Sequence, residues 1–346
     1  MKKILSIVML FFSLSVGSTK KESYAQYVNK SYIVLDALDN KTIEGNNIHI
    51  KRSVASVSKI MTAIVAIENG NLEKTYVIER EDTNTYGSSI YLKEGETISL
   101  LDLLYGLMLR SGNDAAKAIA RIVGGNVEQF IIMMNNKAKD IGMTNTIFNN
   151  PSGLDIEEDG NISTSYDLAL LMSYAIKNDV FNKIVSTKYY SIDGHKWKNK
   201  NKLLFSYNKL IGGKTGFTDK AKRTLVTAAR DKLTTFIIVT LDCGNDFNFH
   251  RFLYERNFQK YETIKLLDKG ESYHFNYKIY SENVLSYTIE KEFISEYKMK
   301  YIIDDNVARI VIFRNNHKET VGKVSVEKIE VKQRINIINT IKNLFS

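Results

Sequence analysis

The stretch Ser56-Val-Ser-Lys59-Ile-Met-Thr-Ala-Ile64 places a serine and a lysine three residues apart at the start of a strongly apolar helical pattern. Side chains at positions i and i+3 of a helix share a face, so this spacing brings a hydroxyl to an amine. The helix dipole and the free N–H groups at such a start favour negative charge on the serine. The pattern alone is more typical of a capping serine beside a solvated lysine. It begins five times in this lysine-rich chain, at Ser18, Ser56, Ser206, Ser295 and Ser325.

Two further motifs make the serine tetrad at residue 56 specific. Ser111-Gly-Asn113 is a Ser-x-Asn, a pattern that also occurs at Ser206 and Ser281, and Lys214-Thr-Gly216 is the single Lys-Thr-Gly of the chain. The three motifs follow one another in this order, each at a predicted junction of secondary structure. Together they predict a nucleophilic serine site.

The segments around these motifs predict a sheet with helices packed on it. Residues 32–36 and 42–43 flank a turn and predict a hairpin, and residues 225–229 and 236–241 predict a second, buried hairpin. Between the hairpins, residues 54–68, 100–123 (interrupted at residues 111–113) and 167–176 have helical periodicity. Helices between an N-terminal and a C-terminal hairpin indicate a mostly antiparallel sheet whose strands come from both ends of one α/β (α+β) domain.

Both ends of the chain differ from this domain. Met1-Lys2-Lys3 and the apolar residues 4–16 predict a signal peptide over residues 1–25, followed by the main domain at residues 26–259. Residues 260–330 contain short alternating segments (274–280, 307–313, 321–326), which predict a small all-β domain. Residues 331–346 predict an amphipathic helix that contacts a membrane surface or ends the β domain. We therefore expect an exported protein of the cell envelope.

Composition excludes several classes of protein. The chain has 346 residues, of which 44% are hydrophobic and 25% charged, which suits two globular domains. Cys243 is the single cysteine, so neither an intramolecular disulfide nor a cysteine metal cluster is expected. The five histidines form no His-Glu-x-x-His pair, so we predict no metal site and no cofactor. The net charge of +9 suits an anionic envelope, and we see no nucleic-acid-binding signature.

With these motifs the sequence resembles the penicillin-binding serine D-alanyl-D-alanine carboxypeptidases of peptidase family S11. The likeness spans roughly residues 30–260 and extends to the segments around the motifs: residues 87–95, 102–116, 148–154, 163–169 and 212–219. The resemblance implies a transpeptidase/β-lactamase-like catalytic domain with helices on a mostly antiparallel sheet. It also agrees with a small all-β C-terminal domain, which members of the family often carry.

Peptide cleavage by an activated hydroxyl explains the residue types of the three motifs. Ser56 is the candidate nucleophile and Lys59 its general base. Because a free lysine has a pKa of about 10.4, burial or a nearby cation must lower the pKa of Lys59. Lys214 is a candidate for that cation and for attracting the substrate carboxylate. We expect Ser111 to relay a proton to the leaving amine, and Asn113 to hydrogen-bond the substrate amide and orient Lys59.

The resemblance implies further binding residues. Thr215 and Gly216 complete the Lys-Thr-Gly motif, with the Thr215 hydroxyl on the substrate carboxylate. The backbone N–H groups of Ser56 and Phe217 correspond to the oxyanion hole of the family. Lys200 stands where the family has a basic residue that helps to hold the carboxylate, although lysine lacks the bidentate geometry of arginine.

Other positions depart from the family or carry no expected role. Ser152 and Asn161 stand where the family commonly has histidines, and we interpret both as rim positions that do not affect the reaction. Asp155, Glu157 and Glu158 are interpreted as a solvated acidic loop.

The leading hypothesis is an exported serine carboxypeptidase that removes the terminal D-alanine from peptidoglycan pentapeptide stems through a Ser56 acyl-enzyme. Its partners would be these stem peptides and, as covalent inhibitors, β-lactam antibiotics. One alternative is a class A-like β-lactamase, which needs a deacylating Glu-x-x-x-Asn for which residues 149–167 offer no convincing equivalent. The other is a non-catalytic envelope protein that binds muropeptides.

Overall fold

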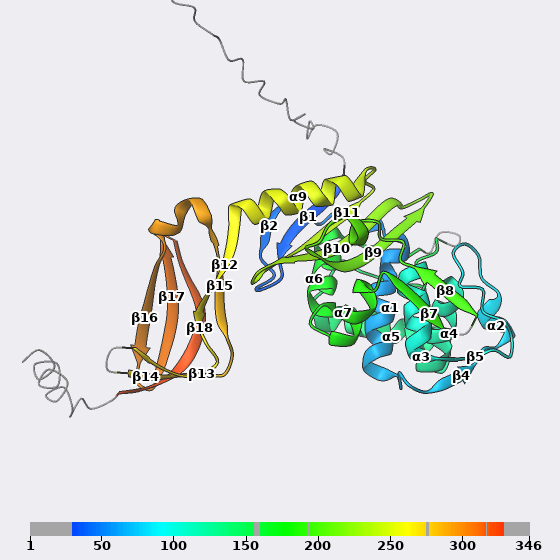
Figure 1. Ribbon diagram of the computed structural model, residues 1–346, viewed down its shortest axis with the longest axis horizontal. Helices are drawn as coiled ribbons and strands as arrows, with labels where there is room; N and C mark the ends of the chain where they lie inside the picture. Colours follow the sequence, from blue (N-terminus) through cyan, green and yellow to red (C-terminus); the bar gives the residue numbers. More distant parts are fainter. Residues whose placement is uncertain (1–29, 156–159, 193, 275–276, 316, 329–346) are drawn as a thin grey trace, which may run out of the picture.

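The computed structural model describes residues 30–155, 160–192, 194–274, 277–315 and 317–328. The predicted signal peptide and the predicted C-terminal helix lie outside these residues. Figure 1 shows a helix-and-sheet domain and an all-β domain, joined where a long helix passes directly into a strand. We call the second part the β domain. The predicted fold class is confirmed.

A five-stranded antiparallel sheet in the order β2-β1-β11-β10-β9 forms the centre of the first domain. The N-terminal strand β1 pairs with β11, so the strands come from both ends of the domain, as predicted. The strands of this sheet are β1 (Ser31–Asp36), β2 (Thr42–Asn46), β9 (Leu210–Thr218), β10 (Lys222–Asp231) and β11 (Thr234–Leu241).

Helices cover both faces of the sheet, which explains why its central strands are apolar without alternation. In β1, Ile33 and Leu35 pack with the larger group of helices, and Val34 packs with α9 on the other face. Figure 1 shows α9 on one side of the sheet and α1, α6 and α7 on the opposite side, and α8 packs on the same face as α9. The helices are α1 (Lys59–Asn69), α2 (Arg80–Thr83), α3 (Leu100–Tyr105), α4 (Asn113–Gly124), α5 (Val127–Ile141), α6 (Ser165–Ala175), α7 (Asp179–Ser186), α8 (Leu203–Ser206) and α9 (Asp246–Lys260).

Short elements connect these layers around the three motifs. A 3-10 turn, η2 (Ala55–Ser58), precedes α1, and a π-helical turn, η3 (Gly106–Arg110), separates α3 from α4. The two-stranded pairs are β3 (Arg52–Ser53) with β6 (Ile162–Ser163), β4 (Thr75–Val77) with β5 (Thr97–Ser99), and β7 (Tyr189–Ile192) with β8 (His195–Lys198).

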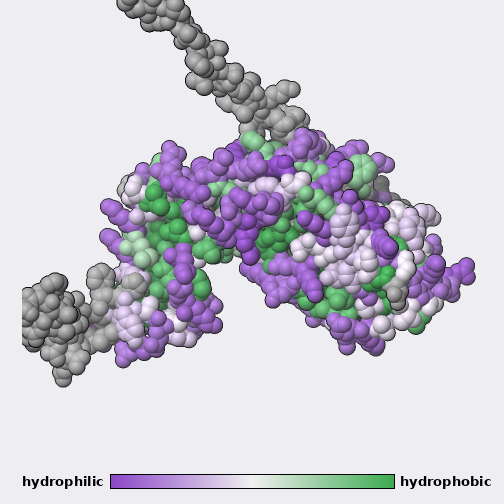
Figure 2. Space-filling view, in the orientation of Figure 1, coloured by the Kyte–Doolittle hydropathy of each residue, from purple (hydrophilic) through white to green (hydrophobic). Residues whose placement is uncertain are grey.

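The β domain consists of a two-stranded and a five-stranded sheet around its own apolar core, which includes Leu267, Ile279 and Ile310. The predicted segments 307–313 and 321–326 lie inside strands, but 274–280 is not one strand, since β13 ends at His274 and β14 begins at Tyr277. Figure 2 shows hydrophobic residues gathered along the middle of this domain. Its elements are β12 (Tyr261–Leu267), β13 (Gly270–His274), β14 (Tyr277–Ser281), β15 (Leu285–Glu290), η4 (Lys291–Glu296), β16 (Lys298–Asp304), β17 (Val307–Arg314) and β18 (His317–Lys328).

Within the described ranges, no helix has the length and apolar character that crossing a membrane requires.

Candidate active site

Ser56 is half-buried in the short turn η2. Lys59, three residues later in the motif, is the first residue of α1. The backbone here is tightly constrained. Ala55 has a φ of 52°, and its carbonyl accepts a 2.8 Å hydrogen bond from the Ser58 hydroxyl. A Cβ on Gly153 would lie 2.0 Å from the same carbonyl oxygen, so only glycine fits against this turn. These contacts hold the backbone of the turn that carries Ser56.

The Lys59 amine is completely buried among three oxygen atoms. Its Nζ lies 3.2 Å from Ser56 Oγ, 2.6 Å from Asn113 Oδ1 and 2.5 Å from the Ser152 carbonyl oxygen. A neutral amine has two N–H donors and one lone pair. The two carbonyl oxygens can only accept, so they take the donors and leave the lone pair for the Ser56 hydroxyl proton. This arrangement suits Lys59 as a general base.

The surroundings of Lys59 favour this neutral form. Burial lowers the pKa of Lys59 well below its ordinary value, and the positive charges of Lys214 and Lys200 lower it further. Asp114 opposes the shift, but its carboxylate already accepts hydrogen bonds from the backbone N–H groups of Ile90 and Leu92. The sequence-based requirement for burial or a nearby cation is therefore met by both causes together.

Lys214 and Ser111 form a second amine–hydroxyl pair. Lys214 Nζ lies 3.0 Å from Ser111 Oγ and donates a 2.6 Å hydrogen bond to the Thr215 carbonyl. Ser111 follows the π-turn η3 with a φ of 65°, a left-handed conformation that turns the chain from η3 into α4. Burial, followed by the charge of Lys200, lowers the pKa of Lys214 to about 7. Lys214 therefore contacts Ser111, while Lys59 contacts the candidate nucleophile.

Asn113 and Lys200 connect these pairs to the loop before β5. Asn113 accepts from Lys59, and its Nδ2 donates a 2.5 Å hydrogen bond to the Tyr86 carbonyl. Lys200 is exposed, and its Nζ donates a 2.8 Å hydrogen bond to Ser88 Oγ. Partial desolvation of its amine and the nearby Arg110 lower the pKa of Lys200. The site thus gathers positive charge, which suits a substrate with a carboxylate.

Strand β9 passes directly beside η2, which carries Ser56 and which we call the nucleophile turn. A Cβ on Gly216 would lie 3.0 Å from the Ser56 backbone nitrogen and 2.4 Å from Thr224 Oγ1, so the absence of a side chain permits this approach. The Phe217 side chain is 60% exposed, and its backbone pairs opposite Arg223. The Lys-Thr-Gly motif was expected at a junction of secondary structure. That prediction was wrong, because the motif lies inside β9.

This geometry brings eight of the nine predicted site residues into one network of hydrogen bonds, charge effects and close contacts. Ser56, Lys59, Asn113 and the pair Lys214–Ser111 are joined by hydrogen bonds or shared charge effects, Lys200 adds charge, and Gly216 touches the nucleophile turn. The Thr215 carbonyl accepts from Lys214, and Phe217 follows Gly216 on β9. Chemically, a hydroxyl beside a neutral amine, with a second ammonium nearby, can perform acyl transfer to serine.

Comparison with known proteins agrees with this chemistry. The sequence model of the peptidase S11 family, described as D-alanyl-D-alanine carboxypeptidase, matches residues 18–245. The chain belongs to this family. It is therefore a serine-type D-alanyl-D-alanine carboxypeptidase of the penicillin-binding group, and the predicted family and enzyme class are confirmed.

Relatives of this S11 carboxypeptidase cover either both domains or mainly the first one. The D-alanyl-D-alanine carboxypeptidase DacF of Bacillus subtilis (strain 168) is 30% identical over 320 residues, or 87% of this chain and 78% of its own. Penicillin binding protein 6B from Escherichia coli has a TM-score of 0.72 at 26% identity, covering 86% and 94% of the two chains. A D-alanyl-D-alanine carboxypeptidase structure from Mycobacterium tuberculosis has a TM-score of 0.63 at 30% identity, covering 66% and 90%.

Two residues expected on the rim of the S11 site are in fact buried. Ser152 is 8% exposed, and its carbonyl oxygen accepts the 2.5 Å hydrogen bond from Lys59. Asn161 is 1% exposed and its side-chain oxygen accepts from the backbone N–H groups of Asn149 and Asn150. Asn161 thereby holds the segment that presents the Ser152 carbonyl. The interpretation as rim positions was wrong, because sequence shows the side chain but not the carbonyl that acts.

Asp155 also differs from its expected place in a solvated loop. It is half-buried and both carboxylate oxygens accept hydrogen bonds from hydroxyl groups. Glu157 and Glu158 lie outside the described residues. No sequence signal distinguished Asp155 from these neighbours, because its partners Ser53 and Thr218 are distant in the chain.

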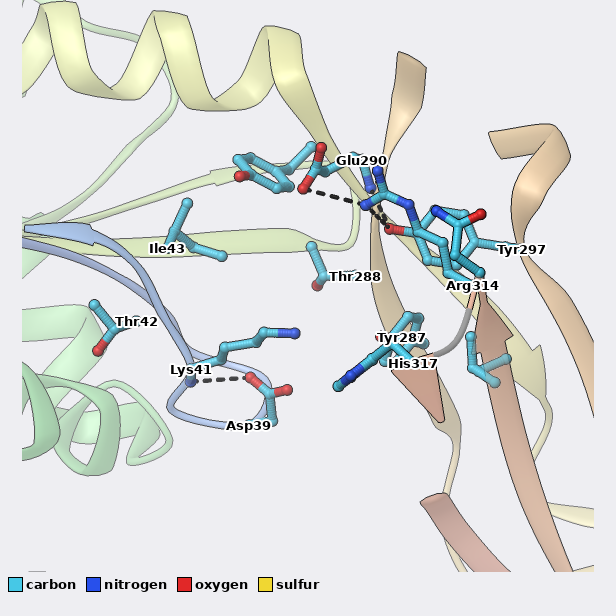
Figure 3. Close-up of a pocket in the computed structure, with 13 residues that line it drawn as sticks. Asp39, Lys41, Thr42, Ile43, Tyr287, Thr288, Glu290, Tyr297, Arg314 and His317 are labelled. Atoms are coloured by element: carbon cyan, nitrogen blue, oxygen red, sulfur yellow. Dashed lines mark hydrogen bonds and ion pairs between the residues drawn. The ribbon is translucent and has the colours of Figure 1, made fainter. Parts of the chain in front are cut away.

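A separate cavity of about 440 Å³ lies at the opposite edge of the sheet, between the β1–β2 turn and the β domain. Figure 3 shows Asp39 and Lys41 of this turn facing Tyr287 and His317 across the cavity. None of the motif residues lines it. Among the described residues, no group of three or more histidine, cysteine or acidic side chains is placed to hold a metal ion.

Proposed function

We propose that this enzyme is exported and removes the terminal D-alanine from peptidoglycan pentapeptide stems, with Ser56 as the acylated nucleophile. The observation that carries the residue assignment is the buried Lys59 amine, which has two carbonyl acceptors for its N–H groups and the Ser56 hydroxyl opposite its lone pair. A serine with such a partner is activated without a histidine.

Acylation begins when Ser56 Oγ attacks the carbonyl carbon of the penultimate D-alanine and its proton passes to Lys59 Nζ. The backbone N–H groups of Ser56 and Phe217 stabilise the negative oxygen of the tetrahedral intermediate. One such donor is commonly worth about 10²–10³ in rate. The bond to the terminal D-alanine then breaks as its nitrogen receives, through the Ser111 hydroxyl, the proton that Lys59 took from Ser56. Lys59 is then neutral again.

Recognition of the terminal carboxylate falls to Lys214 and Thr215, with Lys200 adding long-range attraction. Asn113 hydrogen-bonds the substrate amide while its oxygen holds Lys59. Water then attacks the acyl carbon and gives a proton to Lys59. Lys59 passes this proton to Ser56 Oγ as the ester bond breaks, which releases the shortened stem and regenerates Ser56. β-Lactams acylate the same oxygen, because their ring carbonyl occupies the place of the scissile amide.

Labelling with a fluorescent penicillin tests this assignment. We expect the wild-type protein to be labelled and Ser56→Ala to be unlabelled. Ser206→Ala is the matched control, since Ser206 and Lys209 repeat the Ser-x-x-Lys spacing and the Ser206 side chain is exposed, so its loss should leave labelling intact. A wild-type protein that takes no label would contradict the assignment.

The substrate is tested by liquid chromatography of stem pentapeptides after incubation with the protein. We expect one equivalent of D-alanine and a tetrapeptide per stem, and a long-lived penicillin adduct. Rapid hydrolysis of penicillin without D-alanine release would favour the β-lactamase alternative, and stem binding without either reaction would favour the binding-protein alternative.

We also propose that residues 1–25 direct export and that residues 331–346 add peripheral membrane contact. Both segments lie outside the described residues, and the support is their sequence pattern. Sedimentation of the mature chain with anionic lipid vesicles, beside a chain ending at residue 330, tests the second part. Equal sedimentation of the two chains would contradict it.

A further inference from the structure

The carboxylate of Asp155 links two segments that are far apart in the sequence. Its Oδ1 accepts a 2.6 Å hydrogen bond from Ser53 Oγ, and its Oδ2 accepts one from Thr218 Oγ1. Hydrogen bonds to an ionised acceptor are shorter and about twice as strong as those between neutral groups. The two segments are therefore held to one rigid group.

Each linked segment carries one donor of the proposed oxyanion hole. Ser53 ends β3, three residues before Ser56, and Thr218 ends β9, directly after Phe217. The donors come from different segments, so their separation is not fixed by either one. Asp155 bonds a neighbour of each donor and so spans the gap between them.

The carboxylate of Asp155 is closely packed, and its hydrogen-bond partners make further contacts. A Cβ on Gly160 would lie 2.1 Å from Asp155 Oδ1, so the backbone of this glycine packs directly against the carboxylate. Thr218 Oγ1 also accepts a 3.0 Å hydrogen bond from the Ala221 backbone N–H, which orders the turn after β9. Ser53 is paired with Ile162 in the β3–β6 ladder. Both hydrogen-bond partners of Asp155 are thus themselves held in place.

We propose that Asp155 is a positioning residue that sets the separation of the Ser56 and Phe217 N–H donors in the oxyanion hole. This inference rests on the proposed function. Asp155 does not touch the substrate; it acts through Ser53 and Thr218. Since the donors stabilise charge that develops only in the transition state, loosening them lowers the rate of acylation more than it lowers substrate binding.

The first test compares Asp155→Ala with Asp155→Asn in the full chain. We expect Asp155→Ala to lower kcat and the penicillin acylation rate by about 10- to 100-fold with KM changed less than about threefold, because a misplacement of 1 Å near the chemistry costs about 10² in rate. Asparagine has the same shape as aspartate, with an oxygen that can accept from one hydroxyl and an NH2 group that can donate to the other. Asp155→Asn should therefore retain most of the wild-type rate. Asp219→Ala is the control, since Asp219 is exposed in the same turn.

Binding of a boronic acid separates positioning from general structural damage. The Ser56 oxygen adds to the boron of (1-acetamidoethyl)boronic acid, and the Ser56 proton passes to Lys59. The adduct is a tetrahedral boronate anion with one oxygen in the oxyanion hole. Asp155→Ala should weaken this inhibitor by the same factor as it lowers kcat. The affinity of a stem pentapeptide for Ser56→Ala, measured with and without Asp155→Ala, should stay within about threefold.

Thr218→Val provides a second route if Asp155→Ala does not fold. It removes one hydrogen bond to the carboxylate and keeps a β-branched side chain in β9, so it should lower acylation in the same direction and by a smaller factor. Wild-type boronate affinity in folded Asp155→Ala would overturn the inference, as would an equal loss of stem-peptide affinity. Failure of the wild-type protein to react with penicillin would instead overturn the proposed function.

Discussion

Three lysines of different exposure control the charge in the active site. Lys59 and Lys214 are buried, whereas Lys200 is exposed, and the charge of Lys200 lowers the pKa of both. The proposed mechanism needs Lys59 neutral and Lys214 protonated. The activity therefore depends on the order in which these two amines lose their protons, and Lys200 influences both steps.

Replacing Lys200 by methionine should move the pH profile of the enzyme to higher pH. Removing a nearby positive charge raises the pKa of Lys59, so the base becomes neutral at higher pH, and it raises the pKa of Lys214, so the ammonium persists to higher pH. The measurement is kcat/KM for D-alanine release against pH, which reports the free enzyme. An unchanged profile with a lower rate would assign Lys200 to substrate contact alone.

Bound carboxylate should have the opposite influence on Lys214 from that of Lys200. Burial and the charge of Lys200 lower the pKa of Lys214 to about 7. A substrate carboxylate beside it favours the ammonium and raises this pKa, so the basic limb of kcat should lie at higher pH than the basic limb of kcat/KM. Coincident basic limbs for a carboxylate substrate would show that Lys214 does not bind this group.

Gly153 tests how closely the nucleophile turn is packed. Its φ of 80° disfavours any side chain, and an added Cβ would lie 2.0 Å from the Ala55 carbonyl. Gly142 has a φ of 89° at the end of α5 with nothing within 4 Å of such a Cβ. Both alanine variants should lose about 1 kcal/mol or more of stability from backbone strain. Only Gly153→Ala should also lower the penicillin acylation rate, by about tenfold or more, because it displaces the segment before Ser56.

Sequence patterns revealed residues whose side chains act and missed those that act through the backbone or through distant partners. Ser56 and Lys59 share a motif, and the Lys59 pKa shift follows from its buried helix position. The Ser152 carbonyl and the Asp155 carboxylate depend on contacts with residues 59 and 218, which no local pattern contains. Only the folded chain brings these groups together.

At the scale of elements, α9 binds the central sheet through a buried polar network as well as apolar contacts. The His250 ring contacts Thr227 Oγ1 at 2.7 Å through Nδ1 and Thr240 Oγ1 at 2.9 Å through Nε2. The Tyr254 hydroxyl lies 2.7 Å from the same Thr227 Oγ1 and hydrogen-bonds to it. The two threonines lie on β10 and β11, so one imidazole connects the helix to two strands.

This network should make stability depend on pH. Burial lowers the pKa of folded His250 to about 3, whereas an unfolded histidine titrates near 6.5. Below about pH 6.5 the unfolded chain binds a proton that the folded chain does not, so stability falls as the pH drops towards 3. Between pH 7 and pH 5, His250 should lower the free energy of unfolding by about 2 kcal/mol.

His250→Gln isolates this contribution, because glutamine offers a donor and an acceptor but does not titrate in this range. Urea unfolding of both proteins at pH 7 and pH 5 gives the measurement. The wild-type protein should lose about 2 kcal/mol more than the variant over this interval. Equal losses would show that His250 is not the source of the pH dependence.

The long central strands could be predicted from apolar runs, whereas the turn geometry near the site could not. β10 and β11 contain the predicted buried hairpin at residues 225–229 and 236–241. The π-turn η3 and the left-handed Ser111 lie within residues 100–123, for which the sequence predicts only an interrupted helix. Helical periodicity does not distinguish a π-turn from an α-turn over five residues, and tertiary contacts decide between them.

At the scale of the whole molecule, the two domains have separate cores and a polar junction. The apolar groups of the β domain do not merge with those of the first domain. The junction includes a 3.7 Å ion pair of Lys41 with Glu319 and a 2.8 Å hydrogen bond from the Thr263 N–H to Thr234 Oγ1. The cavity of Figure 3 lies beside the ion pair. The active site lies beside β9, at the other edge of the sheet from this junction.

We therefore expect a chain that ends at Lys260 to keep its chemistry. The Mycobacterium tuberculosis carboxypeptidase structure supports this, since its similarity covers 66% of this chain and 90% of its own, a share close to that of the first domain alone. Distant sites without shared partners act almost independently, so penicillin acylation of Ser56 should change by less than about threefold. The melting temperature should fall, because Phe236 and Phe258 lose contacts with Tyr261 and Lys291. A folded truncated chain with acylation reduced by more than about tenfold would mean that the β domain orders the active site across the sheet.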